Sequence, residues 1–333
     1  MIDVPVLDAH VHVWDPRTTP RETTPAVKLF GFSPRLLAWL APALFPRAAL
    51  AFVGDPRYVL APWTFSDHAD GSPASGFVHV EAAWKRRDPR RYAEETLWLE
   101  SLAEPRLRGI VGHADLAHPD LDALLDAHAA ASGRFCGVRD KLAHTDAPGV
   151  KSWGPKGKMA TAAFRRGFAR LGERGLTFDA WCYGHQLDEL DALLRDLPAT
   201  QVVLDHAGTP VGVFDAPERL GPWLEQLERL AQHSQLNVKL SGLLMPVLGA
   251  PLVRGDASVG QVVDRIGPVV EHALRVFGPK RCILASNFPM DRVAATASVL
   301  WEAFDQLTRG LPDRRGVFGD NAVAFYRLTA PAP

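Results

Sequence analysis

Short apolar runs alternate with longer amphipathic stretches along most of the chain, and this alternation limits the possible folds more than any other feature of the sequence. Several runs are rich in β-branched or aromatic residues and almost continuous, which is typical of parallel strands covered on both faces. The runs span residues 6–13, 76–82, 109–116, 134–141, 176–182, 201–206, 236–241 and 281–285. Helical spacing of apolar residues occurs at 90–103, 121–131, 161–172, 188–197, 223–233, 261–277 and 294–308. Eight strand–helix units within roughly 250 residues predict a (β/α)8 TIM barrel of the α/β class.

An open, doubly wound sheet is the alternative arrangement of such units. That fold usually carries a glycine-rich phosphate loop after its first strand. This chain instead has the sequence HVHVWDP at residues 10–16. The barrel is therefore the favoured architecture, with residues 1–333 as a single domain.

Residues 16–75 interrupt the alternation, because they separate the first two predicted strands by about twice the length that one helix needs. Prolines and bulky aromatic residues recur throughout the segment, which favours a packed insertion over a flexible linker. The insertion leaves the C-terminal end of the first strand, which is the active-site face of a barrel. We expect either a lid over the site or a contact in a homodimer.

Composition and charge exclude several classes of partner. The chain has 37 Lys and Arg against 38 Asp and Glu and lacks a basic stripe or base-stacking motif, which argues against nucleic acid. Its richest apolar stretch is broken by prolines and an arginine, so we expect no membrane-spanning helix. Three cysteines without paired spacing, and an N-terminus without a signal-peptide pattern, predict a cytoplasmic protein. A small molecule is the expected partner.

Histidines stand at the ends of the first and sixth predicted strands. His10 and His12 are two residues apart in an extended segment, so both side chains point the same way. His206 closes the sixth strand in the sequence DHAG, and His185 follows the fifth strand in CYGH. Because neutral imidazoles on one face can hold a divalent metal, His10, His12 and His206 are the predicted ligands. Zinc is the expected ion, with manganese as the alternative.

Six motifs distributed over the chain outside the insertion carry a family resemblance. They are LDAHVHVWDP, GVRDK, FDAWCYGHQL, VVLDHAGTP, NVKLSGL and ILASNFPMD. Together they resemble the lactonase-type branch of the amidohydrolase superfamily, which includes 2-pyrone-4,6-dicarboxylate lactonase and sugar lactonases acting on fuconolactone-like substrates. The resemblance implies a TIM-barrel hydrolase in which His10, His12 and His206 surround the scissile carbonyl, with His185 as a neighbour.

The segment after the eighth predicted strand departs from the superfamily pattern. It reads ASNFPMD, and Asn287 stands where an Asp is typical. An amide cannot take a proton from water at neutral pH, so Asn287 can be a neutral ligand or hydrogen-bond the attacking water, but it cannot be the general base. Asp291 is the nearest carboxylate, and it is either that base or a solvated loop acid or helix N-cap. The missing acid also predicts a metal that is held weakly or is absent.

Two cationic residues on predicted strands complete the candidate site. Arg139, on the fourth strand, can hold a substrate carboxylate with its planar fork, or it pairs with an acid of the protein such as Asp140. Lys239, on the seventh strand, can polarise the carbonyl or neutralise Asp205. The supporting candidates near the ends of the second and third strands are His79, Glu81 and His113.

These residues predict the hydrolysis of a lactone or related cyclic ester by water attack in a barrel mouth lined with histidine. An anionic substituent on the substrate is consistent with Arg139. Two alternatives stay open at this point. One is a metal-dependent decarboxylase of the same superfamily, and the other is a non-catalytic binding protein on a barrel that has lost its acid at Asn287.

Overall fold

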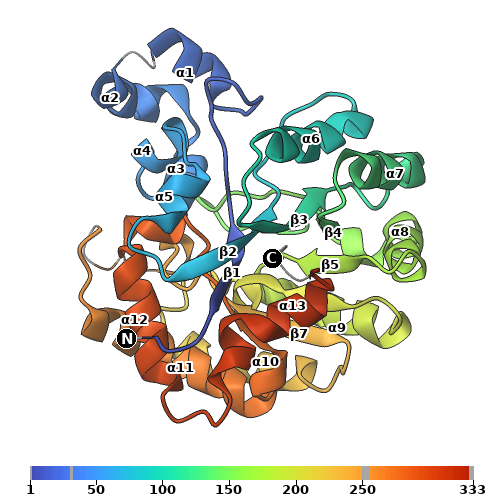
Figure 1. The fold of residues 1–333 in the computed structure, drawn as a ribbon, viewed down its shortest axis with the longest axis vertical. Helices are drawn as coiled ribbons and strands as arrows, with labels where there is room; N and C mark the ends of the chain where they lie inside the picture. Colours follow the sequence, from blue (N-terminus) through green and yellow to red (C-terminus); the bar gives the residue numbers. More distant parts are fainter. Residues whose placement is uncertain (1, 31–32, 250–251, 253–254, 330–333) are drawn as a thin grey trace.

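The computed structural model of the protein describes residues 2–30, 33–249, 252 and 255–329. Its centre is a parallel sheet of eight strands, in which each strand pairs with the next in chain order. The strands are β1 (Val6–Val11), β2 (Ala74–Val80), β3 (Leu107–His113), β4 (Phe135–Arg139), β5 (Thr177–Ala180), β6 (Val202–Leu204), β7 (Leu236–Leu240) and β8 (Cys282–Leu284). This arrangement confirms the predicted TIM barrel (Figure 1).

Backbone hydrogen bonds close the barrel between its first and last strands. The amide of Asn287 donates to the carbonyl of His10 at 2.9 Å, and the amide of His12 donates to the carbonyl of Phe288 at 3.0 Å. The segment after β8 therefore lies directly against the end of β1. Residues from the two ends of the chain share the mouth of the barrel as a result.

Helices cover the outside of the barrel, and each helix predicted between or after the strands has an observed counterpart. These are α6 (Ala93–Ser101), α7 (Leu121–Ala131), α8 (Ala162–Glu173), α9 (Leu187–Asp196), α10 (Leu220–Leu230), α11 (Val259–Val276) and α12 (Ala297–Thr308). The helix predicted from residue 90 begins instead as a 3₁₀ turn (Pro89–Tyr92), in which the side chain of Asp88 accepts a hydrogen bond from the amide of Arg90. Among the described residues, no helix is long and apolar enough to cross a membrane.

Apolar side chains fill the interior of the barrel, as expected for a packed core rather than a pore. Strand residues of this interior cluster include Leu7, Val78, Val111 and Ile283. A last helix, α13 (Asn321–Tyr326), which the sequence pattern did not predict, adds Ala322, Phe325 and Tyr326 to the same cluster. Because these side chains pack near the start of β1, α13 plugs the end of the barrel that is opposite the mouth.

An irregularity in β1 changes which of its side chains face inward. The register between β1 and β2 shifts before Val11. Leu7 and Ala9 belong to the interior cluster, whereas Val11 packs in the outer core beneath the helices. Side chains alternate along a strand and a bulge reverses their phase, so His10 and His12 take the inward positions at the mouth.

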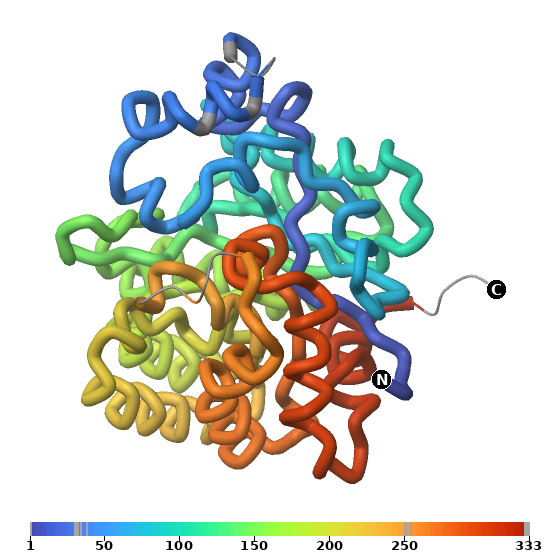
Figure 2. The backbone as a smooth tube through the Cα atoms, turned by 90° about the vertical axis from the view of Figure 1, so that its left-hand side faces the viewer, coloured from blue at the N-terminus to red at the C-terminus, as the bar shows by residue number. Residues whose placement is uncertain are grey.

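The insertion predicted at residues 16–75 is packed and helical. Over its described residues it forms α1 (Thr24–Phe30), α2 (Pro34–Leu44), α3 (Arg47–Val53), α4 (Arg57–Leu60) and α5 (Phe65–Ala69). These helices (blue) lie together on one side of the barrel in Figure 1 and at the top of the molecule in Figure 2. The ring of Phe52 lies 5.2 Å from Trp153 and 5.9 Å from Trp181, centroid to centroid. Trp181 follows β5, so α3 docks at the barrel mouth.

The buried ring of His128 on α7 predicts a loss of stability in acid. Its Nε2 lies 3.2 Å from the carbonyl oxygen of His113, and its ring stacks on Phe135. Burial lowers the pKa of His128 to about 4. In the unfolded chain this residue binds a proton near pH 6.5, whereas in the folded protein it stays neutral down to about pH 4. Protonation therefore favours the unfolded chain, and the free energy of unfolding decreases by about 3 kcal/mol at most as the pH falls from about 6.5 to 4.

We expect His128→Gln to flatten the decline in the free energy of unfolding over this pH window, measured by urea denaturation at several pH values. The matched control is His185→Gln, because the ring of His185 is exposed. An unchanged slope in His128→Gln would show that the ring titrates alike in both states.

Candidate active site

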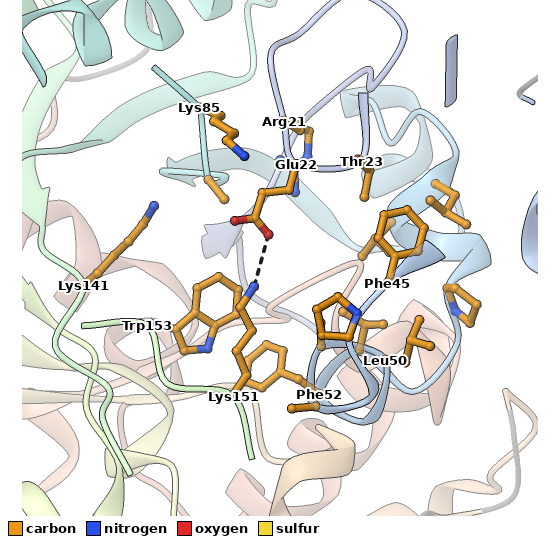
Figure 3. Close-up of a pocket in the computed structure, with 18 of the residues that line it drawn as sticks. Arg21, Glu22, Thr23, Phe45, Leu50, Phe52, Lys85, Lys141, Lys151 and Trp153 are labelled. Carbon is orange, nitrogen blue, oxygen red and sulfur yellow. Dashed lines mark hydrogen bonds and ion pairs between the residues drawn. The ribbon is translucent and has the colours of Figure 1, made fainter. Parts of the chain in front are cut away.

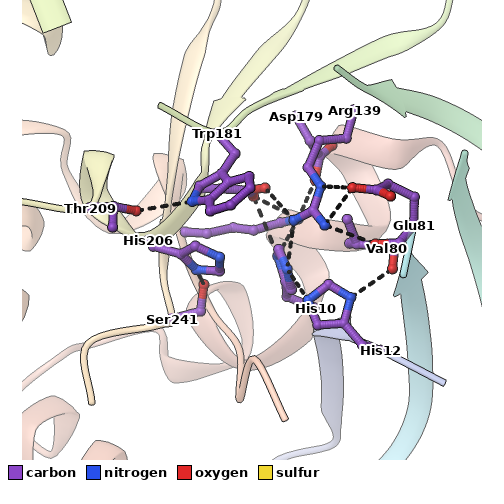
Figure 4. A network of polar contacts seen from close by, with 12 residues as sticks. His10, His12, Val80, Glu81, Arg139, Asp179, Trp181, His206, Thr209 and Ser241 are labelled. Carbon is purple, nitrogen blue, oxygen red and sulfur yellow. Dashed lines mark hydrogen bonds and ion pairs between the residues drawn. The ribbon is translucent and has the colours of Figure 1, made fainter. Parts of the chain in front are cut away.

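Three histidines lie side by side at the mouth of the barrel (Figure 4). The Nε2 atoms of His10 and His12 are 3.3 Å apart, and the rings of His10 and His206 are 4.6 Å apart between centroids. His12 Nδ1 lies 2.8 Å from the carbonyl oxygen of Val80 and must donate to it, which leaves the lone pair on Nε2. Burial lowers the pKa of all three rings, that of His206 to about 3, so they are neutral near pH 7.

A strained turn directs His206 into the mouth. His206 and Ala207 have φ angles of 56° and 49°, in the left-handed region that residues other than glycine rarely adopt. The Oγ of Ser241 lies 2.9 Å from His206 Nδ1 and fixes the ring. A Cβ on Gly242 would lie 2.5 Å from the same ring, so glycine is required there. Asn287 at the mouth also has a left-handed backbone, with φ of 57°.

A buried carboxylate lies behind the histidines. Asp205 is fully buried, and its Oδ1 is 3.4 Å from His10 Nδ1 and 3.2 Å from Lys239 Nζ. Although burial alone would raise the pKa of Asp205, Lys239 and His10 hold it well below its ordinary value. Lys239 also binds Asp179, which accepts a hydrogen bond from the hydroxyl of Tyr326. Lys239 thus neutralises Asp205, one of the two predicted roles, and it does so from inside the barrel.

Arg139 is held by an acid of the protein. Its Nε and Nη2 donate to Oε1 of Glu81 at 3.0 and 2.9 Å, and Nη2 also donates to the Glu81 carbonyl. The remaining nitrogen, Nη1, lies 3.4 Å from His10 Nε2 and 3.6 Å from Asp205. Asp140, the partner considered from the sequence, binds Lys158 instead at 2.7 Å. Glu81 therefore fixes one edge of the guanidinium and leaves the other edge toward the mouth.

A cavity of about 100 Å³ occupies the mouth. Its lining includes His12, Arg139, Trp181, His206 and Asn287, together with Phe52 and Val53 of the insertion. Both polar atoms of the Asn287 side chain are buried, and among the described residues neither has a hydrogen bond of normal geometry, although the amide lies close enough to Asp291 to lower the pKa of that carboxyl. An unsatisfied polar group at a cavity indicates the place of a ligand, because native proteins rarely leave such groups unpaired.

Several residues singled out from the sequence lie outside this cavity. His185 is exposed on a 3₁₀ turn and packs near Tyr183, so it is not part of the histidine group. Asp291 is buried and does not line the cavity, and burial raises its pKa well above the ordinary value, which disfavours the ionised form that a base needs. His79 and His113 bind backbone groups. His79 Nδ1 accepts a hydrogen bond from the amide of Val13, and His113 Nδ1 lies 3.0 Å from the carbonyl oxygen of Arg139.

The donors that converge most closely differ from the predicted metal ligands. Ligand atoms of His10, Asp205 and His206 all lie within 4.8 Å of one another, and this group contains Asp205 where the sequence pointed to His12. Two neutral imidazoles and a carboxylate suit a divalent ion such as zinc. The sequence predicts Asp205 only as a partner of Lys239, although its place next to His206 at a strand end is a signal that can identify it as a ligand.

Comparisons with known proteins identify the family. A family model described as amidohydrolase matches residues 7–328. The chain belongs to this amidohydrolase family. The protein is therefore an enzyme, a hydrolase, as the resemblance implied, and the alternative of a non-catalytic barrel is wrong.

Relatives of this amidohydrolase include a lactonase. This chain is 31% identical to uncharacterized protein y4mH of Sinorhizobium fredii, over 98% of this chain and 100% of that protein. It is 30% identical to L-fucono-1,5-lactonase of Burkholderia multivorans, over 72% of this chain and 78% of that enzyme. Two crystal structures of a Burkholderia multivorans amidohydrolase, one with HEPES and one with zinc, have TM-scores of 0.70 and 0.67. They are 23% and 22% identical, each over 98% of this chain and 100% of the other.

The ion pair between Arg139 and Glu81 predicts a large coupling energy. Arg139→Met would leave the buried Glu81 carboxylate without its cation, so we expect a loss of about 3–5 kcal/mol in the free energy of unfolding. The double variant Glu81→Gln/Arg139→Met should recover part of that loss, because no buried charge is left unpaired.

Urea denaturation of the wild type, both single variants and the double variant measures the coupling. Arg90→Met removes an exposed pair with Asp88 and should have no measurable effect. Equal losses in Arg139→Met and in the double variant would contradict the dependence of Glu81 on Arg139.

Proposed function

We propose that this amidohydrolase opens a lactone or a related cyclic ester in the mouth cavity. The observation that carries the proposal is the convergence of neutral imidazoles, a guanidinium and a buried amide on one cavity at the C-terminal ends of the strands. Reaction with water needs such a set, because it requires a proton acceptor and a group that stabilises the developing oxyanion. The lactonase among the relatives supports the same class of substrate.

Arg139 is the group best placed to stabilise the oxyanion. Glu81 binds its Nε and Nη2 and so fixes the orientation of the guanidinium. The remaining nitrogen, Nη1, faces the histidines. A preorganised cation in a partly dehydrated cavity stabilises charge that develops on the carbonyl oxygen as water attacks. The same edge can hold an anionic substituent on the ring.

His206 is the proposed acceptor of the proton of the attacking water. Its ring is neutral, lines the cavity and is oriented by Ser241. Asp205, which precedes it in the chain and is ionised, stabilises the imidazolium that forms. As the new carbon–oxygen bond to water forms and the ring carbon–oxygen bond breaks, His206 returns the proton to the ring oxygen. The product is an open-chain hydroxy acid, which releases one proton at neutral pH.

The donor set also supports a loosely held divalent metal. His10, His206 and Asp205 would hold it, with His12 presenting the lone pair of Nε2 beside His10. With a metal bound, His206 would be a ligand and not the proton acceptor, because Ser241 occupies its other ring nitrogen. Zinc or manganese, when bound, supplies Lewis-acid polarisation of the carbonyl or of the attacking water. Lys239 and Arg139 lie 3.3 and 3.4 Å from the two nitrogens of His10, and their positive charge weakens the binding of a second cation.

Ring opening can be separated from decarboxylation by its product. With L-fucono-1,5-lactone and other sugar and aromatic lactones, we expect release of one equivalent of titratable acid and no carbon dioxide. His206→Gln should lower kcat by about a hundredfold or more, the scale of a lost proton acceptor. The control is His233→Gln, which lies just before β7 at the opposite end of the barrel. Carbon dioxide from aromatic carboxylates, with no lactone opened, would contradict the proposal.

Asn287→Asp should bind metal more tightly without a gain in rate. The new carboxylate would stand at the cavity beside His12 and His206 and add an anionic ligand. Elemental analysis of protein purified without chelator should show more zinc or manganese per chain than in the wild type. Asn237→Asp, in β7 at the opposite end of the barrel, is the matched control. Higher activity with unchanged metal content would instead mark Asn287 as the place of a lost base.

A further inference from the structure

A second, larger cavity lies between the insertion and the barrel loops (Figure 3). Its volume is about 460 Å³, more than four times that of the mouth cavity, at about 100 Å³. The two cavities are adjacent, because Arg21, Phe52, Ala83 and Trp153 are among the residues that line both. Pockets of several hundred Å³ are the usual size for organic ligands, whereas the mouth has room for little more than a reacting ring.

One side of this outer cavity is cationic. Figure 3 shows Lys85, Lys141 and Lys151 around the carboxylate of Glu22. Although burial alone would raise the pKa of Glu22, these three lysines hold it below its ordinary value, which shows that all three act on one carboxylate. Lys151 forms an ion pair with Glu22 at 3.4 Å. Among the described residues, Lys85 and Lys141 have no ion pair, so the cluster carries excess positive charge.

The other side of the outer cavity is apolar and belongs to the insertion. Phe45, Leu50, Phe52 and Val59 line it. Figure 3 shows Phe45, Leu50 and Phe52 across the cavity from Lys85 and Lys141. A ligand that fills this space therefore meets an apolar wall and an unpaired positive charge together, which are complementary to an amphipathic anion.

We propose that the outer cavity binds an apolar arm of the substrate that ends in an anionic group such as a carboxylate, recognised by Lys85 and Lys141. The inference rests on the proposed function, with the reacting ring in the mouth cavity and the arm extending between α3 and the β4–α8 loop. The insertion then forms one wall of the substrate site. A small uncharged sugar lactone would leave this cavity unused.

Binding of a probe that cannot be hydrolysed tests this assignment. We expect 5-phenylpentanoate to bind the wild type at least about tenfold more tightly than 5-phenylpentan-1-ol by isothermal titration calorimetry at low salt, because only the carboxylate meets the lysines. The preference should shrink as the salt concentration rises. In Lys85→Gln/Lys141→Gln it should fall to about threefold or less.

Two further variants separate charge, packing and location. Phe45→Asn should weaken the binding of both probes alike and leave the preference in place, because it changes only the apolar wall. Lys280→Gln removes one positive charge just before β8, outside the cavity, and should leave both affinities unchanged. Thermal melting verifies that each variant is folded, and Lys85 is exposed and Lys141 half-buried, so both tolerate glutamine.

The outcomes distinguish this inference from the proposed function. Equal affinity for the acid and the alcohol, or a preference unchanged in Lys85→Gln/Lys141→Gln, would overturn the assignment of the outer cavity. A preference that depends on these lysines in a protein that opens no lactone would support the cavity and refute lactone hydrolysis. Lactone opening without any preference for the acid would support lactone hydrolysis and refute the assignment of the outer cavity.

Discussion

The contact between β1 and the segment after β8 is the constraint on which the site depends. Two backbone hydrogen bonds, from Asn287 to His10 and from His12 to Phe288, join the first and last parts of the barrel. They bring the amide of Asn287 to the same mouth as the histidines of β1, although the two lie far apart in the sequence. A parallel barrel sends all its strand ends to one face, and closure of the barrel makes that face a cavity.

Charge balance inside the barrel is the second requirement. Asp205 is a fully buried carboxylate, and burying such a charge without a partner is costly. Lys239 and Arg139 supply the opposite charge, and each is itself tied to another acid, Asp179 or Glu81. The network continues to Tyr326 on α13, whose hydroxyl donates to Asp179, so the helix that plugs the far end of the barrel positions Lys239 through that carboxylate. The imidazoles, which burial keeps neutral, lie at the edge of this network.

The insertion gives this barrel a second compartment. It connects the C-terminal end of β1 to the start of β2, and its helices lie at the mouth of the barrel and not at the plugged end. Phe52 anchors α3 against Trp153 and Trp181, which places an apolar wall opposite the lysines of the β2–α6 and β4–α8 loops. Neither the wall nor the lysines alone form a site, and the cavity exists only because the two are packed face to face.

The sequence by itself determined the barrel, the place of the insertion and the histidines at the strand ends, because hydrophobic periodicity and strand order follow from local pattern. It also identified the family. Only the tertiary structure decided which side chains meet: a register shift in β1 turns His10 and His12 inward, and a left-handed turn aims His206. The partnership of Arg139 with Glu81 in place of Asp140, and the exclusion of His185 and Asp291 from the cavity, depend on packing between elements distant in the chain. Such contacts leave no periodic signal in the sequence, since they arise from the three-dimensional balance of burial and charge.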